Sequence, residues 1–356
     1  MLLFWLQRLT EASHTSVRAA LAALTAFAIS VIVGGWMIRA LRRGGIVEDT
    51  SQPDHAGLDA IQRQKKNVPT MGGLMIIAAI FGSLLLWGDL ADPRLLMGGL
   101  CMGALGTLGF VDDYIKLCGS PRRGLTKKGK LFVQFGLGAV VGWLLIRTSI
   151  EPKLATRCYF PFLDWFDLGR GYILWAAFVI AAASNAVNLA DGLDGLAGGC
   201  SAIAAAALAV FAGLATLPSG PGIVLAPVSP ELCVMAAAVT GAVLGFLWYN
   251  AHPAQIFMGD TGSLMLGGLF GYLGLALKLD LLLLLVGIVF FVDEATVALQ
   301  ILGYKASRKR IFPIAPIHHY FQVHLKWPEQ KIVARAWIIG ALASVLSLMA
   351  LRCFWK

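Results

Sequence analysis

Long apolar stretches recur along almost the whole of this 356-residue chain. Each has about 18 residues or more, which is enough for a helix to cross roughly 30 Å of hydrocarbon. Only 14% of the residues are charged, whereas a soluble domain usually has about 25%. Helices are the expected form, because in lipid every backbone polar group must be bonded within its own segment. The sequence predicts an all-α integral membrane protein with one polytopic domain over residues 1–356.

About ten transmembrane helices are expected. Their predicted ranges are 19–41, 70–88, 95–112, 130–147, 172–190, 196–216, 231–250, 262–279, 281–301 and 334–353. Residues 1–18 contain Arg8 and Glu11 and have no obvious cleavage site. We therefore expect an interfacial helix there and no removed signal peptide.

Lys and Arg are distributed unequally between the two sides of these spans. The first, third, fifth, seventh and ninth connections hold 18 of them, whereas the opposite side holds 10. Positive residues favour the cytoplasmic side, so the odd-numbered connections are predicted to be cytoplasmic and both termini outside. The same rule accounts for the net charge of +9, so no nucleic-acid partner is expected. The six cysteines are scattered without metal-type spacing and predict neither a disulfide nor a metal site.

Four polar clusters lie on the predicted cytoplasmic side. They are residues 111–114, 185–195, 250–263 and 316–319. Polar groups at membrane depth are costly and usually functional. The sequence therefore predicts one active site on the cytoplasmic face.

Some of these clusters also have plainer explanations. Asp112 and Asp113 could be a helix end that reaches water, with Lys116 four residues after Asp112 as its partner. Asp260 could be an N-terminal helix cap. The run from Asn185 to Gly195 favours a site more strongly, because it places two Asn and two Asp beside glycines in one short connection.

The residue types favour chemistry on phosphates. Mg²⁺ takes oxygen ligands and often uses one or two carboxylates together with substrate phosphates. A zinc site at His318 and His319 is not expected, because no cysteine or acid is near them in the sequence. Phosphate binding or proton transfer suits these histidines better.

An ordered set of motifs resembles the phospho-N-acetylmuramoyl-pentapeptide-transferase family of polyprenyl-phosphate N-acetylhexosamine-1-phosphate transferases. The motifs are residues 69–73, 112–116, 188–197, 250–254, 258–263, 315–319 and 327–329. The resemblance covers almost the whole chain. It implies Mg²⁺-dependent transfer of phospho-MurNAc-pentapeptide from UDP-MurNAc-pentapeptide to undecaprenyl phosphate, which gives lipid I and UMP. It also implies a homodimer in contact with membrane lipid in the bacterial inner membrane.

The resemblance further implies roles for individual residues. The catalytic residues would be Asp112, Asp113, Asp260 and His318, and the Mg²⁺ ligands would be Asp260 and Asn250. The substrate-binding residues would be Lys65, Thr70, Lys116, Lys128, Asn185, Asn188, Asp191, Asp194, Asn250, Phe257, Gly259, Ser263, Gln300 and His319. The chain departs from the family pattern at Tyr320 (usually His), Gln322 (usually Glu) and Asp293 (usually Glu).

Two rival functions remain open at this stage. One is a transferase of the same superfamily that uses UDP-GlcNAc or another sugar nucleotide. The 316–319 segment favours the muramoyl enzyme over this alternative. The other is a transporter or lipid flippase. Transporters place their binding groups near the bilayer midplane, whereas the charged groups here gather at the ends of spans.

Overall fold

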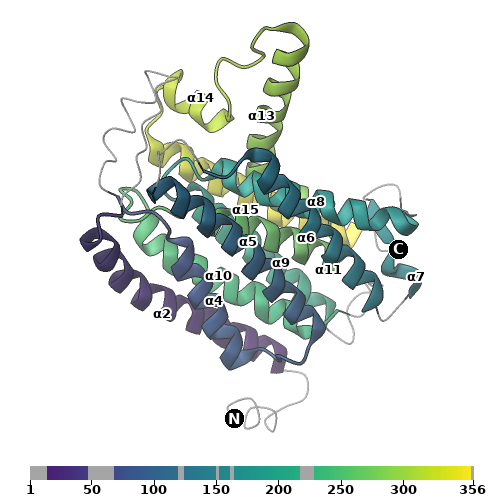
Figure 1. The fold of residues 1–356 in the computed structure, drawn as a ribbon. Coiled ribbons are helices and arrows are strands. Elements are labelled where there is room, and N and C mark those ends of the chain that lie inside the picture. Colours follow the sequence, from purple (N-terminus) through teal and green to yellow (C-terminus); the bar gives the residue numbers. More distant parts are fainter. Residues whose placement is uncertain are drawn as a thin grey trace.

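The computed structural model describes residues 14–46, 68–118, 124–149, 152–160, 164–216 and 228–353. In these segments the protein is a bundle of long helices (Figure 1). The long helices are α2 (His14–Arg43), α4 (Gly73–Trp87), α5 (Pro93–Cys118), α6 (Lys127–Arg147), α8 (Tyr172–Ala190), α9 (Leu196–Ala215), α10 (Pro230–Asn250), α11 (Gly259–Ala276), α13 (Ile288–Ser307) and α15 (Glu329–Cys353). The short helical elements are α7 (Pro152–Ala155), η2 (Gly169–Gly171), α12 (Leu283–Val286) and α14 (Ile317–Val323).

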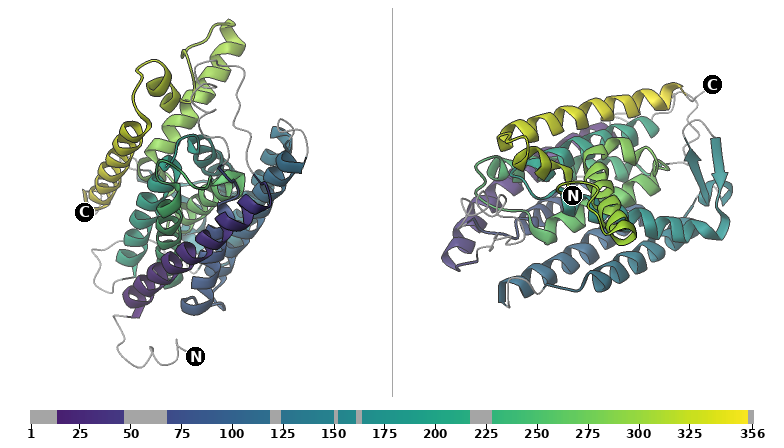
Figure 2. Two further views of the ribbon diagram at one scale, coloured as in Figure 1. Left: turned by 90° about the vertical axis from the view of Figure 1, so that its left-hand side faces the viewer. Right: turned by 90° about the horizontal axis from the view of Figure 1, so that it is seen from above.

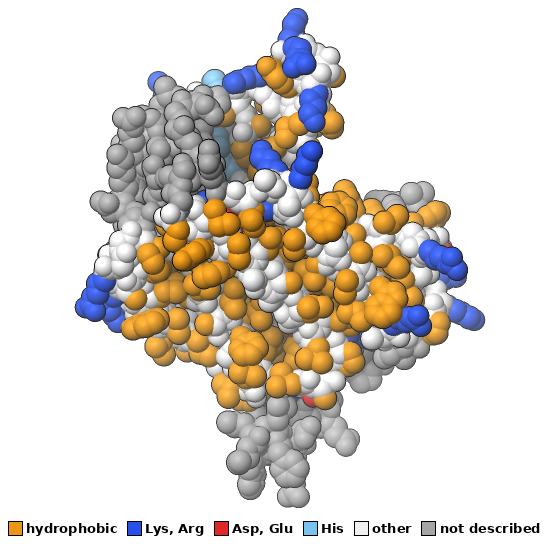
Figure 3. Space-filling model, viewed as in Figure 1, with side chains coloured by type: hydrophobic (Ala, Val, Ile, Leu, Met, Phe, Trp, Pro, Cys, Tyr) orange, Lys and Arg blue, Asp and Glu red, His pale blue; other side chains and the backbone are white. Residues whose placement is uncertain are grey.

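The prediction of a helical membrane protein is confirmed in its coarse form. Within the described residues, seven helices are long and apolar enough to cross a membrane, and α4 is a shorter apolar helix of 15 residues. Each of the ten predicted spans overlaps a helix. Hydrophobic side chains cover the middle of the visible face, and Lys and Arg gather at its margins (Figure 3). This distribution suits a molecule surrounded by lipid.

Three details differ from the sequence prediction. The ninth span is not continuous, because α12 and α13 are separated at Gly287. The connection between α6 and α8 contains an antiparallel hairpin of β1 (Arg157–Phe160) and β2 (Asp164–Asp167), which apolar periodicity did not indicate. Residues 14–18, predicted as the end of an interfacial helix, belong to α2, while residues 1–13 lie outside the described residues.

Helix α11 lies at the centre of the bundle. Every residue from Thr261 to Leu275 is buried, and a helix that is apolar all round belongs in a core. It packs mainly against α5 and α8. Helices α5 and α6 lie on one face of the bundle and α15 on the opposite face (Figure 2). The N-terminal end of α11 is therefore enclosed by neighbouring helices, and the polar residues gather there.

Helix α13 leaves the bundle. Its first half packs against α8, and its second half projects beyond the other helices (Figure 1). The chain then folds back on the projection: the Gln300 side chain accepts hydrogen bonds from the backbone N–H groups of Ile311 and Phe312 and donates one to the Phe312 carbonyl. The chain returns to the bundle through α14.

Candidate active site

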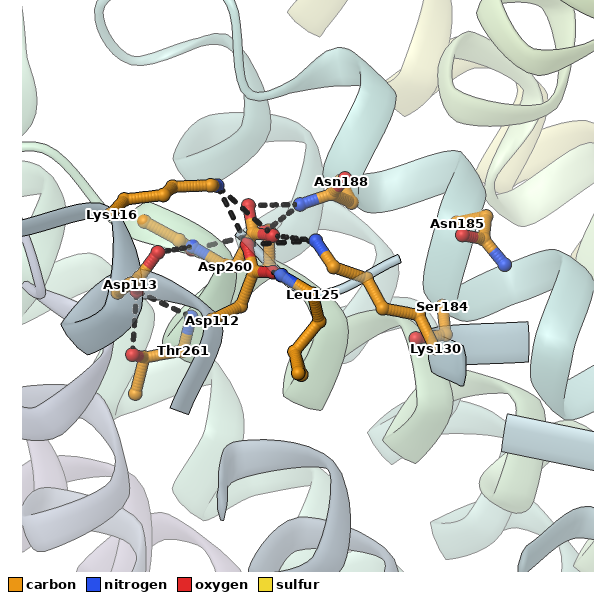
Figure 4. Close-up of polar contacts among 12 residues, drawn as sticks. Asp112, Asp113, Lys116, Leu125, Lys130, Ser184, Asn185, Asn188, Asp260 and Thr261 are labelled. Atoms are coloured by element: carbon orange, nitrogen blue, oxygen red, sulfur yellow. Dashed lines mark hydrogen bonds and ion pairs between the residues drawn. The ribbon is translucent and has the colours of Figure 1, made fainter. Parts of the chain in front are cut away.

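The N-terminal end of α11 is capped by a carboxylate from another helix. Asp113 of α5 accepts hydrogen bonds from the backbone N–H of Asp260 at 3.0 Å and of Thr261 at 2.9 Å, and from the Thr261 hydroxyl at 2.6 Å (Figure 4). The first N–H groups of a helix have no partner within the helix, and a negative charge there is favourable. Asp113 thus fixes where α11 begins, and with it the position of Asp260.

Asp112 is fully buried and surrounded by donors. Its carboxylate lies 2.8 Å from the Nζ atoms of both Lys116 and Lys130, and it accepts a hydrogen bond of 2.6 Å from the backbone N–H of Leu125. A buried carboxylate is stable only when it is paired and hydrogen-bonded. The expected pairing of Asp112 with Lys116 is present, and a second lysine joins it.

Asp260 faces Asp112 across the same two lysines. Its Oδ2 atom lies 2.6 Å from Lys130 Nζ and 3.3 Å from Lys116 Nζ. Its Oδ1 atom accepts a hydrogen bond of 2.9 Å from Asn188, which also donates to the Ser263 hydroxyl at 2.8 Å. The sequence also allowed Asp260 to be an N-terminal cap of its own helix. In the structure it is not one, because its side chain makes no capping hydrogen bond to α11. Its carboxylate points into a cluster built by α5, α6, α8 and α11 (Figure 4).

The three aspartates together offer a site for a hard cation. One carboxylate oxygen from each of Asp112, Asp113 and Asp260 lies within 4.8 Å of the others. Oxygen donors of this kind fit Mg²⁺. Lys116 and Lys130 offset two of the three negative charges, so the cluster keeps one negative charge of its own for a cation and two ammonium groups for phosphate.

Gly259 and Thr70 border this cluster. Gly259 precedes Asp260 with a φ of +73°, and a Cβ there would lie 2.6 Å from Asp113 Oδ2 and 3.1 Å from Thr70 Oγ1. A cavity of about 500 Å³ opens beside it, and Thr70, Asp113 and Lys116 contribute to its lining. Thr70 and Gly259, both predicted as substrate-binding residues, thus lie next to the aspartates, and the adjoining cavity has room for a ligand.

Lys130 was not predicted as a site residue from the sequence. The family resemblance implied Lys128 as a substrate contact, but Lys128 is exposed, whereas Lys130 reaches two aspartates. The signal that could have found it is Thr126, which caps α6 by accepting a hydrogen bond from the Gly129 N–H. A helix start at Lys127 places Lys130 one turn along the helix, on a different side from Lys128.

The loop from Asp191 to Gly195 is held from several directions. The backbone N–H of Asp194 donates to the Glu329 carboxylate of α15. The Asp194 carboxylate lies 3.1 Å from His252 Nδ1 and accepts a 3.1 Å hydrogen bond from the Ala254 N–H. Oxygen and nitrogen atoms of Asp194, His252 and Glu329 also lie within 4.8 Å of one another. Through these contacts, His252 and Glu329 hold Asp194 and the loop around it in place.

Asn250 belongs to the same support. Its Oδ1 atom accepts from the Gly195 N–H at 3.0 Å, and its Nδ2 atom donates to the Ile256 carbonyl at 2.9 Å. The Gly195 carbonyl accepts a hydrogen bond of 3.1 Å from Trp337 Nε1. Asn250 therefore joins two loops, and its predicted role as a Mg²⁺ ligand stays a prediction.

The histidines are backed by an acid that is distant in sequence. His318 Nδ1 lies 2.8 Å from Asp293 Oδ2, and both side chains are buried. No acid is near these histidines in the sequence, but α13 and α14 fold Asp293 against His318 across 25 positions. His319 Nδ1 lies 3.4 Å from Gln322 Oε1, at one of the positions that depart from the family pattern.

The remaining predicted residues are more widely spread. Asn185 donates to Gln134 at 2.9 Å, inside the bundle. The backbone of Phe257 pairs with Pro69 and Gly72, and Gln300 holds the projecting end of α13. Asp191 is half-buried at the start of its loop. Lys65 lies outside the described residues.

Comparison with known proteins identifies the family to which the chain is similar. The model of the family described as Glycosyl transferase family 4 matches residues 95–278, a segment that carries all three aspartates, both lysines and Asn188. Fold and site thus define a membrane-embedded glycosyl transferase of that class.

Full-length relatives are more specific. Proteins named phospho-N-acetylmuramoyl-pentapeptide-transferase from Desulforapulum autotrophicum, Gluconacetobacter diazotrophicus and Chlorobium phaeovibrioides are 38%, 39% and 41% identical to the chain. Each match covers 95% of this chain and 94% of the relative. The chain belongs to the phospho-N-acetylmuramoyl-pentapeptide-transferase family.

Proposed function

We propose that the protein transfers phospho-MurNAc-pentapeptide from UDP-MurNAc-pentapeptide to undecaprenyl phosphate, giving lipid I and UMP. In the net reaction an oxygen of the lipid phosphate becomes bonded to the sugar-bearing phosphorus of the nucleotide, and the bond from that phosphorus to UMP breaks. The single observation that carries the proposal is the convergence of Asp112, Asp113 and Asp260 with Lys116 and Lys130, in a chain whose relatives bear this name.

The site residues have different roles in bringing the two phosphorylated substrates together. Lys116 and Lys130 are the ammonium groups that phosphate oxygens would meet, and Asn188 holds the Asp260 carboxylate in place. Asp113 acts through the backbone of α11 and sets the position of Asp260. Phosphoryl transfer asks mainly for positioning and charge neutralisation, which these groups supply.

We further propose that the cluster binds Mg²⁺ through Asp260, with Asp112 as a second carboxylate. When bound, the ion would neutralise phosphate charge and favour departure of UMP. The proximity of the three carboxylates supports this proposal. Asn250 remains a candidate ligand from the family resemblance alone.

The nucleotide is proposed to bind next to the cluster. The candidate residues are Lys65, Thr70, Asn185, Asn188, Asp191, Asp194, Phe257, Gly259, Ser263, Gln300 and His319, with Lys128 as a further phosphate contact. Thr70, Gly259 and Ser263 have the best support, because they border Asp113, Asp260 or Asn188.

The membrane topology is also a proposal. Ten spans with both termini outside would place the aspartate cluster on the cytoplasmic face of the bacterial inner membrane. The excess of Lys and Arg in the odd-numbered connections supports this orientation. A homodimer is proposed from the family resemblance.

The test is UMP release by the purified protein in detergent, with UDP-MurNAc-pentapeptide and a polyprenyl phosphate. Release should require Mg²⁺, stop in EDTA, and fall at least about 10²-fold in Asp260→Ala, as is typical when electrostatic stabilisation is lost. UDP-GlcNAc serves as the competing substrate. Faster UMP release from UDP-GlcNAc would refute the assignment of the sugar, and full activity in EDTA would refute the assignment of the metal.

A further inference from the structure

The described part of the structure contains an imidazole that is held on one side only. His318 is 4% exposed, and its Nδ1 atom is paired with Asp293 Oδ2 at 2.8 Å. Among the described residues, its Nε2 atom is buried and has no hydrogen-bond partner. A buried polar atom without a partner is costly, so an arrangement of this kind indicates a position where an incoming group completes the bonding.

The pair fixes which ring nitrogen faces that group. A carboxylate accepts hydrogen bonds, so the Nδ1 atom of His318 carries a proton in this contact. The Nε2 atom is then the nitrogen that accepts a proton, or donates one when the ring is charged. Asp293 is only 2% exposed.

The free nitrogen faces a glycine. A Cβ placed on Gly192 would lie only 2.8 Å from His318 Nε2, so a larger residue would fill the space in front of that nitrogen. Gly192 lies in the 191–195 loop that follows α8. The same helix supplies Asn188, which holds Asp260. The Nε2 atom thus faces the 191–195 loop, and the helix before that loop carries the residue that holds Asp260.

We propose that Asp293 is a positioning residue, which holds His318 with its Nε2 atom directed at the phosphates of the bound substrates. This inference rests on the proposed function and adds a residue to it. Asp293 touches no substrate. It acts only through the tautomer and the orientation of His318.

A double-mutant cycle tests this dependence. UMP release is measured for the parent, Asp293→Asn, His318→Gln and the double variant, with kcat and KM separated and the thermal unfolding midpoint recorded. We expect kcat to fall about 10²-fold in His318→Gln and about tenfold in Asp293→Asn, with the KM for the sugar nucleotide changed less than about threefold. The double variant should match His318→Gln within about twofold, since two residues acting in series are not additive.

Two further variants complete the test. Asp293→Glu keeps a carboxylate and should retain more activity than Asp293→Asn. Glu294→Gln removes the neighbouring carboxylate of α13, leaves the Asp293–His318 pair in place, and should behave as the parent.

The outcomes separate the inference from the function on which it rests. A parent that releases no UMP refutes the proposed function. An active parent with multiplying losses in the double variant, or with equal losses in Asp293→Glu and Asp293→Asn, overturns the positioning role alone.

Discussion

The cap that α5 provides for α11 predicts two separable defects. Asp113→Ala removes the acceptor of three hydrogen bonds, two from the backbone N–H groups of Asp260 and Thr261 and one from the fully buried Thr261 hydroxyl. Loss of a helix cap costs about 1 to 2 kcal/mol, and each further buried donor left without a partner costs about 1 kcal/mol or more. We expect a loss of about 3 kcal/mol in the free energy of unfolding, or about a hundredfold in the folding equilibrium.

The comparison variant is Asp260→Ala. It removes a carboxylate of the same cluster but leaves the start of α11 capped, so it should lose activity with a smaller fall in the unfolding midpoint than Asp113→Ala. Thermal unfolding in detergent, followed by tryptophan fluorescence, and UMP release are measured on the same preparations. Asp113→Ala should show both a lowered midpoint and lowered activity. If its midpoint equals that of the parent, the cap does not stabilise α11 and the reasoning fails.

Two other predictions concern single residues near the cluster. Lys130→Met should lower UMP release at least about tenfold, because it removes the ammonium group that bridges two carboxylates. Lys127→Met changes an exposed lysine of the same helix that has no proposed role, and it should stay within about twofold of the parent; the reverse order would contradict the assignment. Gly192→Ala puts a methyl group against the free imidazole nitrogen, at 2.8 Å, and should lower kcat with little effect on the unfolding midpoint. Gly136→Ala, where no atom lies within 4 Å of the added Cβ, is its control and should retain the parent's kcat.

The convergence of the aspartates could be predicted because membrane spans alternate in direction. Once the spans are counted, every second connection lies on the same side. That parity alone brings Asp112, Asp113 and Asp260 to one end of the bundle, where the structure has them together. Which side of the membrane this end faces was predicted from Lys and Arg, and stays a prediction.

The contacts within the cluster could not be predicted in the same way. The choice between Lys128 and Lys130 depends on the rotation of α6 about its axis, which an apolar pattern fixes only loosely. The pairing of Asp293 with His318 depends on the fold-back after α13, which brings together residues from two helices. The division of the ninth span at Gly287 was equally hidden, because both halves are apolar.

The support around residues 191–195 bears on how a ligand would be received. Asp194 is tied to the start of α15 and to the chain after α10, and Gly195 is tied to Asn250 and Trp337. A segment anchored in this way has little conformational entropy left to lose when a molecule docks against it. The favourable free energy of contacts made there would therefore appear mostly as affinity, because little of it is offset by the cost of ordering the protein.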